Sequence, residues 1–229
     1  MDGMLLVDKP SGWTSFDVVN FVRRTIALSL NKKPKQIKVG HCGTLDPLAC
    51  GLLILLIGTY TKRAGELSGM DKSYVFNLRL GQVSTTGDDE GEKITVSNLV
   101  PAKKDIQASL LEHIGTITQV PPIYSAIKID GQRAYDLARR GKPVTMKPRS
   151  ITVINLKLLK YSYPDLELSA DVSSGTYIRS LAEDIGKYLG CGAYVTYLKR
   201  VKIGSYCVDD AVPPSGLTAQ KIYDRLQSM

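Results

Sequence analysis

The side chains best suited to chemistry are crowded into one short segment, GHCGTLDPLACGLL, at residues 40–53. It holds Asp46, directly before Pro47, and His41, one of only two histidines among 229 residues. Polar side chains and flexible glycines crowded directly before an apolar run mark this segment as a candidate site. The same spacing also predicts a structural turn, in which Asp46 caps one helical turn, Pro47 takes its first position and Gly51 ends it. Capping explains neither His41 nor the glycines near it, so both interpretations stand.

His41 has three possible roles. It could bind a metal ion with Cys42 and Cys50, but this spacing fits no common zinc site. It could also be a structural histidine satisfied within the fold, or a planar ring that packs against nucleic-acid bases. The four cysteines of the chain form no C-x-x-C pair, which favours a reduced, intracellular protein.

Tyr74 and Arg179 also occupy informative positions. Tyr74 begins an alternating apolar stretch, which fits a core aromatic whose hydroxyl needs a partner. Arg179 falls in the first turn of a predicted helix, where the helix dipole disfavours a cation by about 0.3–1 kcal/mol. An i, i+4 pair with Glu183 recovers roughly 0.2–0.5 kcal/mol. Because these effects nearly cancel, a carboxylate elsewhere in the fold would supply the reason for Arg179.

The charge distribution points to a polyanionic partner. Lys and Arg number 30 against 22 Asp and Glu, a net charge of +8. Residues 23–38 contain six cations and no acid, and residues 128–149 contain seven cations against two aspartates. Since phosphate contacts favour clustered cations, nucleic acid is a partner that this charge predicts.

Several common catalytic templates are absent from the sequence. It contains no G-x-x-x-x-G-K-[ST] phosphate loop, no H-x-E with P-C-x-x-C of the zinc deaminases and no G-x-S-x-G elbow. Two histidines also leave little basis for a histidine-dependent triad.

The elements that must position these residues alternate irregularly between strands and helices. Strands are predicted near residues 4–7, 73–82, 150–161, 166–173 and 194–208. Helices are predicted near residues 105–114, 133–141 and 176–190, and a further helix starts near residues 14–17 and runs toward the basic segment that begins at residue 28. In the first helix, Phe16, Val18, Val19 and Val22 are expected to share one apolar face. LLILLI, residues 52–57, could be a strand buried on both faces or part of a core helix, and it is far shorter than the roughly 20 residues that span a bilayer. The pattern predicts an α+β fold with a mixed, largely antiparallel sheet.

Together these motifs resemble those of the TruB family of tRNA pseudouridine synthases. GHCGTLDPLACGLL is similar to the family's catalytic motif. Further likenesses, within residues 5–200, are LLVDKPSGWTS, KSYVFNLRLGQVSTTGDDEG, PPIYSAIKIDGQRAYDLARRG, SSGTYIRSLAEDIG and CGAYVTYLKR. Cys42 and Cys50 depart from the threonines usual in the family, but both are small, so little effect is expected. Relatives usually carry an RNA-binding PUA domain, and the residues after SYCV are too few for one.

The resemblance implies an isomerase with the pseudouridine synthase fold, a central sheet flanked by helices. It would act on the uridine at position 55 in the T-loop of tRNA, breaking the N1–C1′ bond, turning the base and rejoining it through C5. No metal or organic cofactor would be needed. Asp46 would be the catalytic carboxylate, as a nucleophile or in forming a glycal intermediate. Tyr74 would stack on the target base and help proton transfer, and Arg179 would pair with Asp46.

The resemblance also implies RNA contacts. Leu198 would line the uracil pocket, His41 would fill the space left by flipped bases, and Tyr177 is expected to contact the substrate. A thumb insertion at about residues 121–149 would clamp the T-stem loop together with the loop 23–38, and is expected to be mobile without RNA. The substrate-binding cations expected on the thumb are Lys128, Arg139 and Arg140.

Physical arguments fit these roles. A nearby cation favours the ionised form of a reacting carboxylate. Flipping a nucleotide out of its stack costs a few kcal/mol, of which an aromatic platform can return roughly 1–3 kcal/mol. We expect a single catalytic domain over residues 1–229, without a PUA domain, that acts as a cytoplasmic monomer with no membrane and no obligate protein partner.

Two other functions stay open. One is a non-catalytic module that binds and folds tRNA, which the intact Asp46, Tyr74 and Arg179 disfavour. The other is a pseudouridine synthase subunit that depends on a guide RNA. The long insertion after residues 121–122 looks like that of stand-alone enzymes and disfavours this second function.

Overall fold

The computed structural model describes residues 1–129 and 131–227. The chain divides into two compact units, one formed by Met1–Tyr74 with the C-terminal residues from Lys199, the other by Val75–Leu198. It passes from one to the other within strands β4 (Lys72–Leu80) and β12 (Ala193–Ile203). Strands and helices are mixed in both, and paired strands are mostly antiparallel, which confirms the predicted α+β class.

The sheet of the first unit is built around β3 (Cys50–Ile57). β1 (Gly3–Lys9) and β2 (Val39–Cys42) pair with β3 antiparallel, and the C-terminal part of β12 pairs with it in parallel. A short strand, β13 (Tyr206–Cys207), pairs with the end of β12. The apolar run 52–57 is therefore a strand, which answers the question that its periodicity left open.

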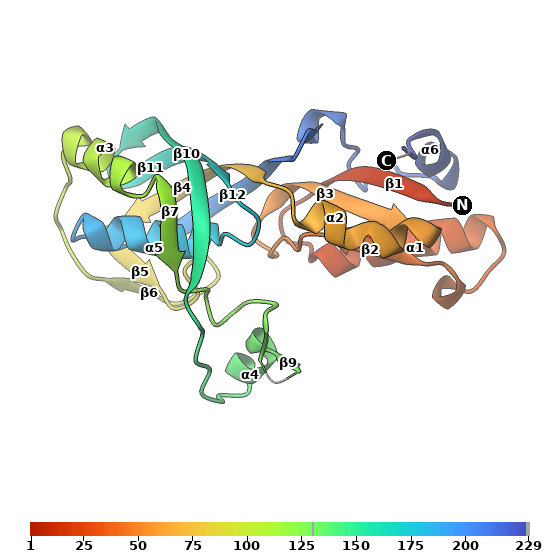
Figure 1. The fold of residues 1–229 in the computed structure, drawn as a ribbon, viewed down its shortest axis with the longest axis horizontal. Helices are drawn as coiled ribbons and strands as arrows, with labels where there is room; N and C mark the ends of the chain where they lie inside the picture. Colours follow the sequence, from red (N-terminus) through yellow and green to blue (C-terminus); the bar gives the residue numbers. More distant parts are fainter. Residues whose placement is uncertain (130, 228–229) are drawn as a thin grey trace. The chain divides into compact units, whose positions relative to one another are not determined.

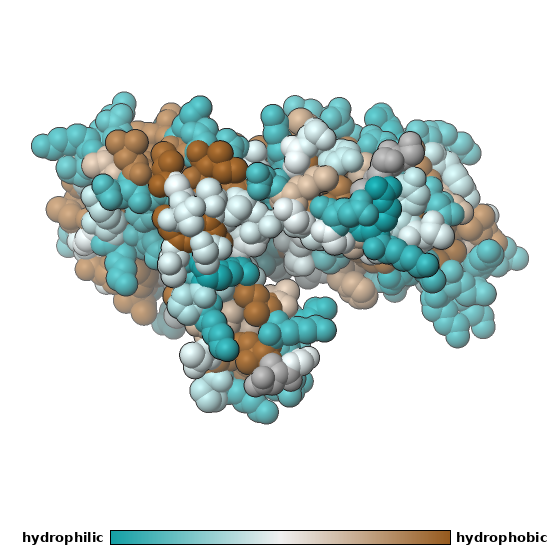
Figure 2. All heavy atoms as spheres, viewed as in Figure 1, coloured by the Kyte–Doolittle hydropathy of each residue, from teal (hydrophilic) through white to brown (hydrophobic). Residues whose placement is uncertain are grey.

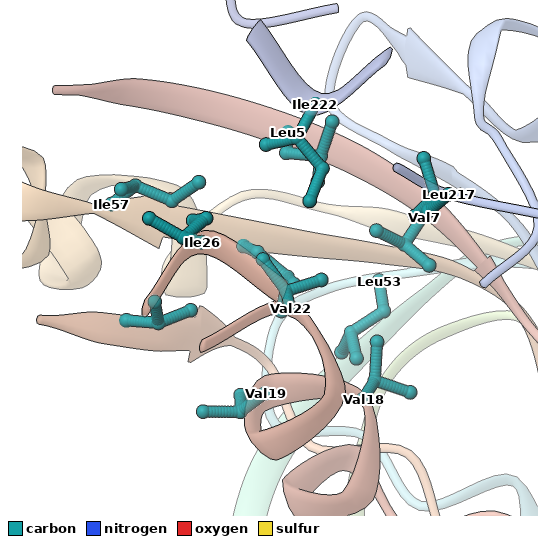
Figure 3. Close-up of a cluster of buried hydrophobic side chains, with 12 residues drawn as sticks. Leu5, Val7, Val18, Val19, Val22, Ile26, Leu53, Ile57, Leu217 and Ile222 are labelled. Atoms are coloured by element: carbon teal, nitrogen blue, oxygen red, sulfur yellow. The ribbon is translucent and has the colours of Figure 1, made fainter. Parts of the chain in front are cut away.

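Both faces of β3 are covered, which explains the unbroken apolar run. Leu53, Leu55 and Ile57 belong to one buried cluster, which includes Val22 and Ile26 of helix α1 (Ser15–Ser29). Figure 3 shows this cluster. The alternate residues of β3 belong to a second buried cluster, with Leu67 of helix α2 (Ala64–Ser68). Side chains of β3 do alternate between the two faces of the sheet, but they are hydrophobic on both faces because both are buried.

Helix α1 begins as predicted. Thr14 is its N-cap: the Asp17 backbone N–H donates to Thr14 Oγ1 at 3.1 Å, and the Thr14 N–H donates to Asp17 Oδ2 at 2.8 Å. Val18, Val19 and Val22 are buried, but Phe16 is 58% exposed, so its placement on their face was wrong. Two helical steps of about 100° put Phe16 on the opposite side from Val18.

The sheet of the second unit contains four strands beside the N-terminal part of β12. Their order is β12, β4, β11 (Asp165–Val172), β10 (Arg149–Ser162) and β7 (Gly115–Gln119). Along β4 the side chains alternate as predicted, and Tyr74, Phe76, Leu78 and Leu80 are buried.

The second unit also contains helices α3 (Lys103–Glu112) and α5 (Ile178–Tyr188). The apolar face predicted for α5 is buried, with Ile178, Leu181, Ala182 and Ile185. Outside the segment between β7 and β10, the other elements are β5 (Gln82–Ser84), β6 (Lys93–Thr95), α6 (Ala219–Asp224) and the 3-10 turns Pro34–Gln36, Gly58–Arg63 and Val208–Asp210. Within the described part of the chain, no helix is both long enough and apolar enough to span a membrane.

The predicted thumb is the segment between β7 and β10. It contains β8 (Lys128–Ile129), β9 (Gln132–Arg133) and α4 (Ala134–Arg139), and Figure 1 shows it projecting from the ends of β7 and β10. Its two ends meet, because Arg149 pairs with Gln119 in the antiparallel register. On the face drawn in Figure 2, the segment carries both hydrophilic and hydrophobic residues. Asp130, one of its two acids, lies outside the described residues.

Candidate active site

Asp46 lies in the loop between β2 and β3, in the first unit. The Ala49 N–H donates to the Asp46 carbonyl at 3.1 Å, which closes a turn with Pro47 at its second position. The loop contains no helix, so the predicted helical turn was wrong, although Asp46 does begin a turn. Proline fits this place because its fixed φ suits the second residue of a β-turn. The Asp46 side chain is half-buried.

The Asp46 loop is fastened to the connection between β1 and α1. The Lys9 ammonium donates to the Pro47 carbonyl at 3.4 Å, and the Gly12 N–H donates to the same oxygen at 2.8 Å. Ser15 Oγ donates to the Leu45 carbonyl at 2.9 Å and accepts from the Leu45 N–H at 2.8 Å. These bonds restrict the backbone on both sides of Asp46.

Lys9 is the least expected member of this arrangement. It is fully buried, and its ammonium also donates to the carbonyls of Pro10 at 2.9 Å and Trp13 at 2.5 Å. Burial lowers the pKa of Lys9 to about 8, while the negative charge of Asp46 is among the effects that raise it. By the same coupling, the Lys9 ammonium favours ionised Asp46. Nothing in the sequence pattern singled out Lys9, since a lysine before a proline also fits a surface turn.

His41, Cys42 and Tyr74 lie in the same unit as Asp46. His41 is a half-buried residue of β2, paired with Leu55 of β3. Burial raises the pKa of the neighbouring Cys42 thiol to about 11, so this thiol stays protonated near neutral pH. Tyr74 is buried near the start of β4. Across residues 1–129 and 131–227, no cluster of three or more His, Cys, Asp or Glu side chains could hold a metal ion.

Arg179 lies in the second unit, in the first turn of α5. Its guanidinium donates to the Thr86 carbonyl at 2.9 Å and to the Tyr124 carbonyl at 2.7 Å. Asp88 Oδ2 lies 3.5 Å from Arg179 Nη1, and both side chains are about 95% buried, with exposures of 5% and 4%. A distant carboxylate was expected for Arg179, and Asp88 is one such partner. The predicted pairing with Asp46, a residue of the other unit, stays a prediction.

Glu183, the alternative partner considered for Arg179, is an exposed residue of α5. Partial shielding of its carboxylate from water raises the pKa of Glu183, the neighbouring Asp184 raises it further, and the Arg179 charge acts in the opposite direction. Two further hydrogen bonds fix the Asp88 carboxylate, because Thr86 Oγ1 and the Glu90 N–H both donate to its Oδ1. The ion pair with Asp88 therefore accounts for Arg179 within this unit better than the local pair with Glu183.

The start of α5 is held by Gln119, a residue that sequence patterns did not single out. Gln119 is fully buried; its Oε1 accepts from the Tyr177 N–H at 2.8 Å and its Nε2 donates to the Tyr177 carbonyl at 3.1 Å. These bonds hold the N-cap residue Tyr177 in place, and the side chain of Tyr177 makes no capping bond. The Arg149 guanidinium stacks on the Tyr177 ring at 4.8 Å. Two residues at the base of the thumb thus fix Tyr177, two positions before Arg179.

The other predicted substrate contacts also lie in the second unit. Leu198 is a buried residue of β12. Lys128, Arg139 and Arg140 are exposed on the thumb. Arg139 also lies 5.8 Å from the centre of the Tyr135 ring. Exposed cations can reach phosphates, so this placement is compatible with the predicted RNA contacts.

Comparison with known proteins agrees with the motifs. Residues 30–178 match the family described as TruB family pseudouridylate synthase (N terminal domain), and residues 179–227 match the tRNA pseudouridylate synthase B C-terminal domain. The tRNA pseudouridine synthase B of Parabacteroides distasonis is 42% identical over 212 residues, which are 92% of this chain and 89% of that protein. The same-named protein of Burkholderia lata is 42% identical over 95% of this chain, but only 65% of that protein is covered.

Solved structures give a consistent picture of the fold. A Cbf5-Nop10-Gar1 complex contains a chain similar to this one, with a TM-score of 0.67 and 28% identity over 92% of this chain and 52% of that one. An H/ACA RNP bound to a substrate RNA contains another, with a TM-score of 0.66 and 26% identity over 92% of this chain and 50% of that one. The family matches extend across both units and include the Asp46 loop and Arg179. The chain belongs to the TruB family of pseudouridylate synthases.

Proposed function

We propose that this chain converts the T-loop uridine at position 55 of tRNA into pseudouridine. The family assignment gives the reaction class, isomerisation of a uridine in tRNA. The observation that carries the proposal is the geometry of the Asp46 loop. The Asp46 carboxylate is half-buried, and hydrogen bonds from Lys9, Gly12 and Ser15 restrain the backbone of the loop. A restrained backbone holds a reacting group in position at little entropic cost during the reaction.

The reaction moves one bond and is balanced without any other reactant. The C1′–N1 bond of the uridine breaks, the base turns, a C1′–C5 bond forms, the proton on C5 leaves, and N1 gains a proton. Asp46 attacks C1′ as a nucleophile or removes a sugar proton to form a glycal. Both routes need an ionised carboxylate, which the Lys9 ammonium favours.

The remaining site residues receive roles by position and chemistry. Tyr74 stacks on the extruded uracil, Leu198 lines the base pocket, and His41 fills the space that the base leaves. Arg179, a cation held by Asp88, adds positive charge that favours the ionised form of Asp46. Tyr177, fixed through its backbone by Gln119, contacts the substrate.

The exposed cations of the thumb and of residues 23–38 bind the RNA backbone in this proposal. Lys128, Arg139 and Arg140 are exposed on the thumb, as are Lys32 and Lys35 on the loop of the first unit. RNA loops are read by shape and by splayed bases, and phosphate contacts supply much of the affinity. The chain acts on tRNA as a cytoplasmic monomer, as a single catalytic domain and without an obligate protein partner.

The test is the variant Asp46→Asn, assayed on an unmodified T-arm hairpin and on a tRNA transcript. Pseudouridine, mapped by mass labelling, should form with wild type at position 55 and fall by about 10⁴-fold or more with the variant, while RNA affinity is retained. The matched control is Asp209→Asn, at an exposed aspartate, which should keep full activity. Product formation by Asp46→Asn at the wild-type rate would refute the role of Asp46.

The same assay separates the alternative functions. A wild-type chain that refolds tRNA without forming pseudouridine would be a binding module. A chain that needs an added guide RNA would be a guide-dependent subunit. Activity of the chain alone on the transcript excludes both.

A further inference from the structure

Arg200 is a buried guanidinium attached to both ends of the Asp46 loop. It lies in the part of β12 that belongs to the first unit, and it is 1% exposed. Its Nη2 donates to the Gly43 carbonyl at 2.8 Å, and its Nε donates to the Leu52 carbonyl at 2.8 Å. Gly43 is the first residue of the loop and Leu52 is the third residue of β3, so one planar group joins the chain before Asp46 to the chain after it.

The backbone is shaped to admit Arg200 at both places. Gly51 pairs with Arg200 in the parallel register, and a Cβ at Gly51 would lie 2.3 Å from the Arg200 carbonyl oxygen. Gly43 has φ +77°, and a Cβ there would lie 3.4 Å from Arg200 Nη1. The glycines at the two ends of the loop therefore occur where the backbone and the side chain of Arg200 come closest.

A charge at this buried position needs a reason. Removing a guanidinium from water is costly, and an apolar side chain of similar size would avoid that cost. The fork of donors on arginine can reach two carbonyls at a fixed separation, whereas the ammonium of a lysine acts as a point. Burial is the chief cause of the lowered pKa of Lys9, and the charge of Arg200 lowers it further. Lys9 in turn donates to the Pro47 carbonyl inside the loop. Both the hydrogen bonds and the charge of Arg200 thus converge on the Asp46 loop.

We propose that Arg200 is a positioning residue for Asp46. By holding the carbonyls of Gly43 and Leu52 it keeps the loop in the one shape that presents the carboxylate to the reacting nucleotide. It acts on turnover and leaves RNA affinity unchanged, since its guanidinium is buried under the loop. This inference rests on the proposed function, in which Asp46 is the reacting carboxylate.

The test compares Arg200→Lys and Arg200→Met with wild type on a T-arm hairpin. The single-turnover rate at saturating RNA should fall by about 10- to 100-fold in both variants, as expected for a small misplacement of a reacting group. The Kd of the hairpin, measured by fluorescence anisotropy, should stay within about twofold of wild type, because misplacing Asp46 affects the transition state more than binding. Arginine is required rather than any cation, so Arg200→Lys should not restore the rate.

A matched control separates positioning from general loss of stability. Val22→Ala removes core volume in the same unit, in a cluster of which Arg200 is not a member, and should lower the thermal midpoint while keeping the single-turnover rate. A second readout is the addition of guanidinium ion to Arg200→Ala, which should restore part of the rate without changing the Kd.

Each outcome decides between positioning and a purely structural role. The proposal is overturned if Arg200→Lys has the single-turnover rate of wild type, or if both Arg200→Lys and Arg200→Met fail to fold. It is also overturned if Val22→Ala loses as much rate as an Arg200 variant that has the same thermal midpoint. Loss of RNA affinity in place of rate would overturn it as well. A wild-type chain that forms no pseudouridine would instead refute the proposed function, which keeps the two failures distinct.

Discussion

At the scale of single residues, the first unit owes its site to buried cations. Lys9, Lys72 and Arg200 are each less than a tenth exposed, and each donates to backbone carbonyls. The acceptors of Lys9 and Arg200 include carbonyls of the Asp46 loop, whereas Lys72 donates to the carbonyl of Ser68 while its Cε would lie 3.4 Å from a Cβ at Gly43 in that loop. Carbonyl oxygens can satisfy a buried ammonium or guanidinium without neutralising its charge. Positive charge thus accumulates beside the Asp46 loop, whose carboxylate must be ionised in the proposed reaction.

Lys72 gives a pH prediction with a definite sign. Burial lowers its pKa from 10.5 to about 8; Arg200 lowers it further, while Asp71 and Cys42 raise it. Between pH 8 and 10.5 the unfolded chain binds more protons than the folded chain, so Lys72 makes the free energy of unfolding rise with pH across this window. Lys72→Met should lose the Lys72 part of that rise and keep the part due to Lys9, whose pKa is also about 8. The stability difference should therefore shift in favour of wild type across the window, by at most a few kcal/mol.

Urea unfolding measured below, within and above this window tests the prediction. Lys35→Met, at an exposed lysine of the basic loop, is the control and should follow the wild-type profile. Parallel pH profiles for wild type and Lys72→Met would contradict the assignment of a depressed pKa to Lys72.

At the scale of elements, the approach of β3 to β12 depends on a residue without a side chain. Gly51 has φ +99°, and its missing Cβ leaves room for the Arg200 backbone. A methyl group there would force the two strands apart at the end of the Asp46 loop. The loop between β2 and β3 is therefore shaped by strand packing as well as by its own turn.

Three glycine-to-alanine variants separate strain from steric exclusion. Gly51→Ala combines a positive φ with a contact at 2.3 Å and should lower the free energy of unfolding by several kcal/mol. Gly12→Ala has φ +83° but meets no heavy atom within 4 Å among the described residues, so it should cost about 1–2 kcal/mol. Gly65→Ala, in α2 with an ordinary φ, should raise the free energy of unfolding by about 0.5–1 kcal/mol. Equal losses for Gly51→Ala and Gly12→Ala, measured by chemical denaturation, would show that close packing at Gly51 is unimportant.

At the scale of the whole molecule, much of the positive charge that gives the net +8 lies in two exposed basic segments, residues 23–38 and the thumb. The thumb is the one whose ends are anchored beside α5, through Gln119 and Arg149. Binding of a folded RNA arm by such cations releases counterions, so affinity should fall steeply with salt.

Replacing Lys128, Arg139 and Arg140 with alanine together tests the thumb. The slope of log Kd against log salt should become shallower by about 2, because each phosphate that a cation neutralises contributes roughly 0.7 to the slope. The hairpin should also bind more weakly at low salt. The control removes the same charge from exposed lysines elsewhere in the unit, at Lys103, Lys104 and Lys157. An unchanged slope in the thumb variant, or an equal change in the control, would count against the clamp.

The sequence by itself determined the features that depend on near neighbours in the chain. The capping box that starts α1, the alternation along β4 and the apolar face of α5 were all predictable, because each is set by side chains within a few residues of one another. The crowding of Asp46, His41 and glycines into one segment, and its likeness to a family motif, also marked the candidate site in advance.

Only the tertiary structure decided the features that depend on partners distant in the chain. The run 52–57 is a strand because separate clusters cover its two faces, which no local period reveals. Lys9, Gln119 and Arg200 reach carbonyls that are 38, 58 and 157 residues away. A buried polar side chain is recognisable only from the partner that satisfies it, and the fold, not the spacing along the chain, supplies that partner.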